Sequence, residues 1–105
     1  MTQKTKQPKT KEEIIEQIKP VLRKHDITKA GIYGSYARGN TSPDSDVDLL
    51  IDFNDRKNIF DLVGIEQELE NKLNLAVDLS TFRSLSDRFK PYITSDLFIF
   101  YNNND

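Results

Sequence analysis

The chain has 105 residues and a formal net charge of −2 at pH 7, from 15 Lys or Arg and 17 Asp or Glu residues. This length predicts one small domain that buries about 65% of the surface of its unfolded chain, and the absence of cysteine excludes disulfides and thiolate metal sites. A slightly acidic chain has no general electrostatic attraction to nucleic acid, so we do not expect a nucleic acid as its direct substrate.

The N-terminal segment, residues 1–9, is polar and basic. We expect it to form a disordered arm, followed by a single domain over residues 10–105. The segment lacks the apolar run of a signal peptide, and no stretch of the sequence approaches the length of a membrane span. The sequence therefore predicts a cytoplasmic protein with no membrane partner.

The first helix is expected to begin after Thr10, because Thr10 and Glu13 have the spacing of a capping box. Its apolar residues recur at helical spacing and predict one buried stripe, formed by Ile14, Ile15, Ile18, Val21 and Leu22. Pro20 lies within this stripe and predicts a kink or a break. His25 is expected to be a cation at the helix end rather than a catalytic base, because a strand separates it from the next polar turn.

A short strand over residues 30–33 is followed by Gly34-Ser35, which predicts a site for an anion. Glycine lets the backbone approach a ligand closely, and Ser35 offers a hydroxyl at the start of a helical turn, where backbone N–H groups lack partners. Arg38 adds a planar fork of donors that suits a triphosphate. Residues 39–45 are rich in turn formers, so we expect the chain to loop out there.

The next strand is expected over residues 46–53. Side chains alternate between the two faces of a strand, so Asp46 and Asp48 share one face, and the other face is apolar, with Val47, Leu49, Ile51 and Phe53. Carboxylates about 6 Å apart repel by about 3 kcal/mol at an effective dielectric of about 20. Mg²⁺ removes this repulsion, since it prefers one or two carboxylates together with substrate phosphates. We therefore predict Asp46 and Asp48 as metal ligands and Asp52 as a solvated residue at the strand end.

Residues 58–72 predict a second helix, with Asn74 as its C-terminal stop. Its inward side chains are expected to be Ile59, Phe60, Leu62, Val63, Leu69 and Leu73. The strand that follows, residues 75–80, has Asp78 opposite an apolar face. When this strand pairs beside the strand of residues 46–53, Asp78 joins the two earlier acids, and three acids can hold two metal ions.

The end of the chain predicts a helical turn at residues 85–89, limited by Pro91, and a final edge strand at residues 97–101. Alternation favours Phe98 and Phe100 as core residues over partner-binding residues. The order of elements predicts an α/β or α+β two-layer domain, in which helices pack on a small mixed β-sheet.

The spacing of Gly34-Ser35, ten further residues, Asp46-Val47-Asp48 and a third acid at Asp78 resembles the signature of the polymerase-β-like nucleotidyltransferase superfamily. In so short a chain, Gly-Ser-Tyr-Ala-Arg-Gly followed by Ser-Asp-Val-Asp-Leu-Leu resembles more narrowly the minimal nucleotidyltransferases, particularly the MntA-type antitoxins of HEPN-domain toxins. The resemblance covers roughly residues 11–101.

The resemblance implies a role for each motif. The Gly34-Ser35 turn binds the nucleotide phosphates, Asp46 and Asp48 hold Mg²⁺, and Asp78 helps to activate the incoming hydroxyl. It further implies ATP as the substrate, two Mg²⁺ ions as the cofactor, and transfer of AMP to a tyrosine of a partner HEPN toxin, whose RNase activity is thereby silenced.

Two other functions use the same residues. A nucleotidyltransferase for a small molecule such as an aminoglycoside would share the turn and the acids, but such enzymes usually have an additional helical domain for the acceptor, which we do not expect here. A non-catalytic nucleotide-binding or interaction module would be expected to lack one of the acids, and Asp46, Asp48 and Asp78 are all present.

Overall fold

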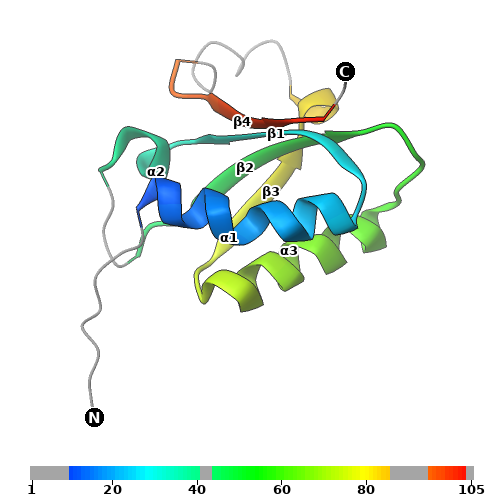
Figure 1. Cartoon of the computed structure of the whole chain (residues 1–105), viewed down its shortest axis with the longest axis horizontal. Helices are drawn as coiled ribbons and strands as arrows, with labels where there is room; N and C mark the ends of the chain where they lie inside the picture. Colours follow the sequence, from blue (N-terminus) through cyan, green and yellow to red (C-terminus); the bar gives the residue numbers. More distant parts are fainter. Residues whose placement is uncertain (1–9, 41–43, 86–94, 104–105) are drawn as a thin grey trace.

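The computed structural model describes residues 10–40, 44–85 and 95–103. Its elements in chain order are α1 (Lys11–Lys24), β1 (Ile27–Tyr33), α2 (Ser35–Arg38), β2 (Val47–Phe53), α3 (Ile59–Leu73), β3 (Val77–Thr81), the 3₁₀ helix η1 (Phe82–Ser84) and β4 (Phe98–Asn102) (Figure 1). The arm expected at residues 1–9 and most of the helical turn expected at residues 85–89 lie outside the described residues.

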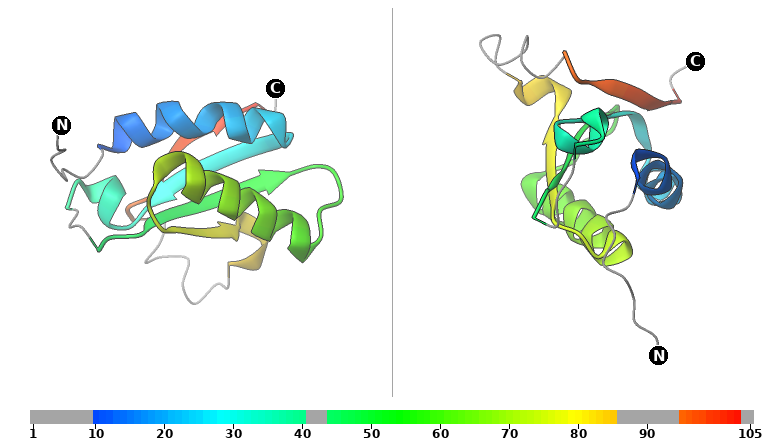
Figure 2. Two further views of the ribbon diagram at one scale, coloured as in Figure 1. Left: turned by 90° about the horizontal axis from the view of Figure 1, so that it is seen from below. Right: turned by 90° about the vertical axis from the view of Figure 1, so that its left-hand side faces the viewer.

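The four strands form one mixed sheet in the order β3-β2-β1-β4. β1 pairs antiparallel with β2 and β4, whereas β2 and β3 are parallel and are joined by α3. Helices α1 and α3 lie side by side on one face of the sheet (Figures 1 and 2). This arrangement confirms the predicted two-layer fold. Within the described ranges, no helix is long and apolar enough to cross a membrane.

Helix α1 has the capping box expected from its sequence, with Thr10 accepting from the Glu13 N–H at 3.1 Å and Glu13 accepting from the Thr10 N–H at 2.8 Å. All five residues of its predicted apolar stripe are buried. The helix continues through Pro20, so the predicted break is wrong. Pro20 is exposed, and the buried side chains before and after it hold both halves of the helix on the same core.

His25 is the C-cap residue of α1, and its Nε2 lies 2.8 Å from Oε1 of Glu68 on α3. Lys24 Nζ lies 2.7 Å from the other oxygen of the same carboxylate. These hydrogen bonds from His25 and Lys24 lower the pKa of Glu68. His25 therefore ties α1 to α3, at the end of β1 opposite to Gly34, as expected for a residue outside the polar turn (Figure 1).

Helix α3 begins after its N-cap Asn58 and ends at Asn74, which has a left-handed conformation (φ 58°), as predicted. Its buried side chains are Ile65, Leu69 and Leu73, with Leu62 partly buried. The predicted inward positions of three residues are wrong, because the helix face that meets the sheet follows residues 62, 65, 69 and 73. The exposed fractions of the other apolar side chains of this helix are 64% for Ile59, 81% for Phe60 and 41% for Val63. We call these three residues the α3 patch.

Strand β4 lies at the sheet edge, as predicted, and Phe100 packs against the core. Phe98 is 45% exposed, so its assignment to the core is wrong; the Lys11 ammonium lies 4.4 Å from its ring centroid. The register explains the difference. Tyr101 pairs with Ala30 and Ile99 with Gly31, which leaves Phe100 as an extra residue in β4 and interrupts the alternation of side chains.

Candidate functional site

The predicted acids meet where β2 and β3 begin. Asp48 on β2 and Asp78 on β3 are direct register partners in the parallel pair. Neighbouring strands lie about 4.8 Å apart, so partners in register project their side chains from the same face at short range. Asp46 precedes β2 by one residue and acts on Asp48 through its charge. The structure thus brings the three acids together at one end of the sheet.

The Asp48 carboxyl group is half-buried at this site. Burial raises the pKa of Asp48 from 3.8 to about 6, and the charges of Asp78 and Asp46 contribute in the same direction. The positive charge of Arg38 opposes this shift. A half-buried carboxylate between two other carboxylates has an excess of negative charge around it, and a divalent cation compensates such an excess.

Gly34 joins β1 to α2 and lies directly against Asp48. Its dihedral angles, φ 78° and ψ −153°, belong to a region that only glycine adopts readily. A Cβ atom built on Gly34 would overlap Oδ2 of Asp48. The glycine therefore gives the chain its turn and leaves room for the carboxylate.

We expect Gly34→Ala to lower the free energy of unfolding by at least about 2 kcal/mol, because it combines a forbidden backbone conformation with displacement of Asp48. Gly39→Ala is a matched control. Gly39 also has a positive φ, 75°, but no atom of the described residues outside its immediate chain neighbours lies within 4 Å of the position of its Cβ. The loss on its substitution is therefore expected to be about 1 kcal/mol. Urea unfolding of the two variants measures the difference, and equal losses would contradict the contact with Asp48.

Helix α2 is a single turn that carries Ser35 at its start and Arg38 at its end. Tyr36 is fully buried between them and anchors the turn in the core. Ser35 is half-buried, whereas Arg38 is exposed and its Nη1 lies 2.6 Å from Oδ2 of Asp96. The predicted anion-binding residues are thus beside the acids, and Arg38 has a carboxylate partner that its sequence position did not indicate.

Two glutamates of α3 hold β3, and with it Asp78, in position. Glu70 accepts a hydrogen bond from the Val77 N–H and Glu66 accepts one from the Leu79 N–H, both at 3.0 Å. These N–H groups lie on either side of Asp78 along an edge strand. The outer edge of β3 is therefore hydrogen-bonded to α3, and its inner edge pairs with β2. These two sets of contacts together fix the register in which Asp78 lies opposite Asp48.

Tyr33 is a residue at this site that sequence reasoning missed. It is the register partner of Asp48 on β1. Burial raises the pKa of Tyr33, and the nearby charges of Asp48 and Asp78 raise it further. The antiparallel pairing of β1 with β2 would have identified Tyr33, because in such a pair the last residue of β1 lies opposite the start of β2.

The three carboxylates do not enclose an ion by themselves. Among the described residues, no group of three or more acidic or histidine side chains has the geometry of a metal site. The donor set fits a cation that takes one or two carboxylates and completes its shell with substrate oxygens and water, as Mg²⁺ does.

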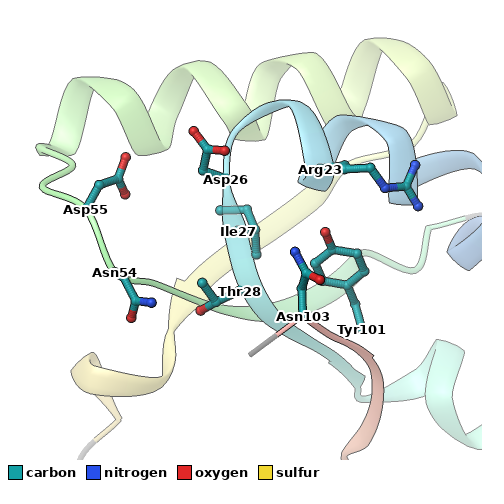
Figure 3. A pocket seen from close by; sticks show the side chains of 8 residues that line it. All are labelled: Arg23, Asp26, Ile27, Thr28, Asn54, Asp55, Tyr101 and Asn103. Atoms are coloured by element: carbon teal, nitrogen blue, oxygen red, sulfur yellow. The ribbon is translucent and has the colours of Figure 1, made fainter. Parts of the chain in front are cut away.

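Two hollows of the surface lie away from the acids. One, of about 390 Å³, is lined by residues from the ends of α1, β2 and β4, including Arg23, Asp55 and Tyr101 (Figure 3). The other, of about 510 Å³, lies between His25 and Phe60 at the N-terminal end of α3. None of the predicted site residues lines either of these two hollows.

A Gly-Ser turn beside carboxylates on two adjacent strands of a small mixed sheet defines a domain of the nucleotidyltransferase class. The family model of the polymerase beta nucleotidyltransferases matches residues 16–105. The chain belongs to this family, which confirms the resemblance read from its motifs.

Three similar proteins illustrate the relationship. A Methanocaldococcus jannaschii protein named as a putative protein adenylyltransferase is 39% identical over 84 residues, which cover 80% of this chain and 90% of the relative. The protein adenylyltransferase MntA of Thermococcus cleftensis is 35% identical over 79 residues, covering 68% of this chain and 80% of the relative. The structure of a tri-AMPylated HEPN toxin of Shewanella oneidensis in complex with its MNT antitoxin contains the same fold, with a TM-score of 0.70, 19% identity, and coverage of 89% of this chain and 73% of that chain.

Proposed function

We propose that this chain transfers AMP from Mg-ATP to a tyrosine hydroxyl of a HEPN-domain toxin and acts as the antitoxin of that toxin. The observation that carries the catalytic part is the register pairing of Asp48 with Asp78 next to the Gly34 turn. The names of the relatives support the acceptor class, since two of them, at 35% and 39% identity, are named as protein adenylyltransferases.

The nucleotide is held from the side of α2 in this proposal. The backbone of the Gly34-Ser35 turn and the Ser35 hydroxyl donate to phosphate oxygens, and Arg38 adds a charge-assisted contact. Asp46 and Asp48 hold the Mg²⁺ ion that accompanies the triphosphate. When bound, Mg²⁺ neutralises charge on the phosphates and lowers the pKa of the incoming hydroxyl.

The acceptor approaches from the side of β3. Its tyrosine oxygen attacks the α-phosphorus of ATP, the bond from that phosphorus to the bridging oxygen breaks, and pyrophosphate leaves with the electron pair. Asp78 lies on a different strand from the other two acids, and in our proposal it ligates a second Mg²⁺ and accepts the proton of the attacking hydroxyl.

Two features of the surface support a protein as the acceptor. Asp46 and Asp78 are exposed, so a large substrate can reach them, and the α3 patch exposes apolar side chains of the kind that mark protein interfaces. The patch lies at the end of α3 remote from the acids (Figure 1). A partner that covered the patch would be anchored on the helix layer while its tyrosine reached the other end of the sheet.

The direct test is incubation of the purified chain with radiolabelled ATP, Mg²⁺ and a HEPN-domain protein, for which a reading frame neighbouring its gene is the first candidate. Label on a tyrosine of that protein, found by peptide mass spectrometry, is the expected result. Label on an aminoglycoside and not on the protein would favour the small-molecule reaction instead. Nucleotide binding without transfer to either would indicate a non-catalytic module.

The partner surface makes a separate prediction. We expect Phe60→Glu to weaken the complex with the HEPN protein by about 30-fold or more, since a central aromatic residue of an interface typically contributes at least about 2 kcal/mol. Affinity for an ATP analogue should not change, because Phe60 is remote from the acids. Gln67→Glu, at an exposed position on the same helix outside the patch, is the matched control. Equal complex affinities for Phe60→Glu and the control in calorimetry would contradict this surface.

A further inference from the structure

The ion pair between Arg38 and Asp96 joins two parts of the chain that lie 58 residues apart. Its Nη1–Oδ2 distance is 2.6 Å, and the exposed fraction of the side chain is 49% for Arg38 but only 24% for Asp96. The Asp96 carboxylate is thus more buried than the Arg38 guanidinium. A guanidinium has five N–H donors, so a contact through Nη1 leaves most of its donors for another acceptor.

The sheet register explains why Asp96 lies beside this turn. Ile32 pairs with Phe98 in the antiparallel β1–β4 ladder. Continued by two residues, the same register sets Asp96 next to Gly34, the first residue of the candidate phosphate turn. The segment just before β4 therefore lies beside the candidate phosphate turn, a position that the acids and the Gly-Ser turn do not reveal.

Helix α2 by itself gives Arg38 little support. It has only four residues and ends at Gly39, which has a left-handed conformation. Arg38 is its last residue, and an exposed arginine at such a position has many rotamers of similar energy. The bond to Asp96 connects the guanidinium to the segment before β4 and restricts its rotamers, and the charge of Arg38 acts on Asp48.

We infer that Asp96 is a positioning residue, which holds the Arg38 guanidinium ready for the phosphates of the nucleotide. This inference rests on the proposed function, because it requires that Arg38 contacts the nucleotide. Asp96 itself does not touch the substrate. It reduces the loss of side-chain conformational entropy of Arg38 on nucleotide binding, because the side chain is already in place before the nucleotide arrives.

The test is a double-mutant cycle of nucleotide affinity, measured by calorimetry with a non-hydrolysable ATP analogue and Mg²⁺. Arg38→Ala is expected to weaken binding by about 10–100-fold, the range for a charge-assisted contact. Asp96→Ala should weaken it by about 5-fold in the wild-type background and by no further factor in the Arg38→Ala background. Asp55→Ala removes the ion pair of the exposed Asp55 side chain with Lys57, at 3.0 Å and far from the turn, and should leave the affinity unchanged.

The other outcomes separate the possible failures. If Asp96→Ala binds the analogue as tightly as the wild type, Asp96 does not position Arg38; if it binds more tightly, the carboxylate competes with phosphate for the guanidinium, and the inference is overturned. If Asp96→Ala weakens binding equally in the two backgrounds, its role is in the fold alone. If Arg38→Ala binds normally, the phosphate role of Arg38 fails, and the inference fails with it. If Asp96→Ala has no effect on affinity but Arg38→Ala weakens binding, only the role of Asp96 is overturned, and the proposed function is unaffected.

Discussion

Replacement of Asp48 by Asn, or of Asp46 by Asn, is expected to reduce AMP transfer by at least about 100-fold while the fold remains intact. Loss of a residue that only supports a metal ligand typically costs 10–100-fold, and in our proposal these two acids hold the ion directly. The fold should persist because both side chains lie on the face opposite the main core. Initial rates of label transfer from ATP, with circular dichroism of each variant, measure both quantities.

The same substitution at Asp48 is expected to make the metal-free protein more stable at pH 7. The Asp48 carboxyl titrates at its ordinary value of 3.8 in the unfolded chain but near pH 6 in the folded protein. Between these values the folded state binds more protons, so the free energy of unfolding falls as the pH rises through this window. Asp48→Asn removes that loss.

The expected gain is roughly 1–2 kcal/mol, reduced from the full value of about 3 kcal/mol because the side chain is half exposed. Asp44→Asn is the matched control, since Asp44 is exposed in the neighbouring turn and its charge is not among those that raise the pKa of Asp48. Urea unfolding at pH 4 and pH 7, in the presence of a chelator, distinguishes the two variants. A wild-type protein whose stability does not fall between these pH values would contradict the electrostatic account of the site.

The elements that local chemistry determines were predictable from the sequence. The capping residues Thr10 and Asn58 begin their helices, and the alternation in β2 and β3 gave the correct faces for Asp48 and Asp78. The pairing of these two strands also follows from a general rule, because a strand, a helix and a second strand in sequence favour a parallel pair. Most of the candidate site therefore comes from short segments with strong periodicity.

The parts that were not predictable depend on contacts between distant segments. Apolar residues at the start of α3 fit the helical period well enough to suggest burial, but only the packing of the helix on the sheet decides that Phe60 faces away. In β4, an extra residue at Phe100 shifts the register, and no local pattern marks it. The contact of Arg38 with Asp96 likewise exists only because β4 pairs with β1.

The last expected result concerns Asp78, which our proposal assigns to the acceptor rather than to the nucleotide. Asp78→Asn should leave the affinity for Mg-ATP within about 3-fold of the wild type, since Asp46 and Asp48 remain. The transfer rate should fall by about 100–10,000-fold, the range for loss of a general base. This combination is characteristic of an interaction made mainly in the transition state. Calorimetry with an ATP analogue and single-turnover labelling of the HEPN protein measure the two effects separately.

Asp44→Asn is the control for this experiment, because Asp44 is an exposed acid of the neighbouring turn to which we assign no role. An Asp78→Asn protein that labels its partner at the wild-type rate would make the third acid a bystander, and the register pairing with Asp48 would then have only a structural meaning. A variant that no longer binds Mg-ATP would instead make all three acids ligands of one nucleotide-bound ion. Separate roles for β2 and β3 in catalysis require two results. Asp78→Asn must lower the transfer rate without lowering the affinity for Mg-ATP, and Asp48→Asn must lower both.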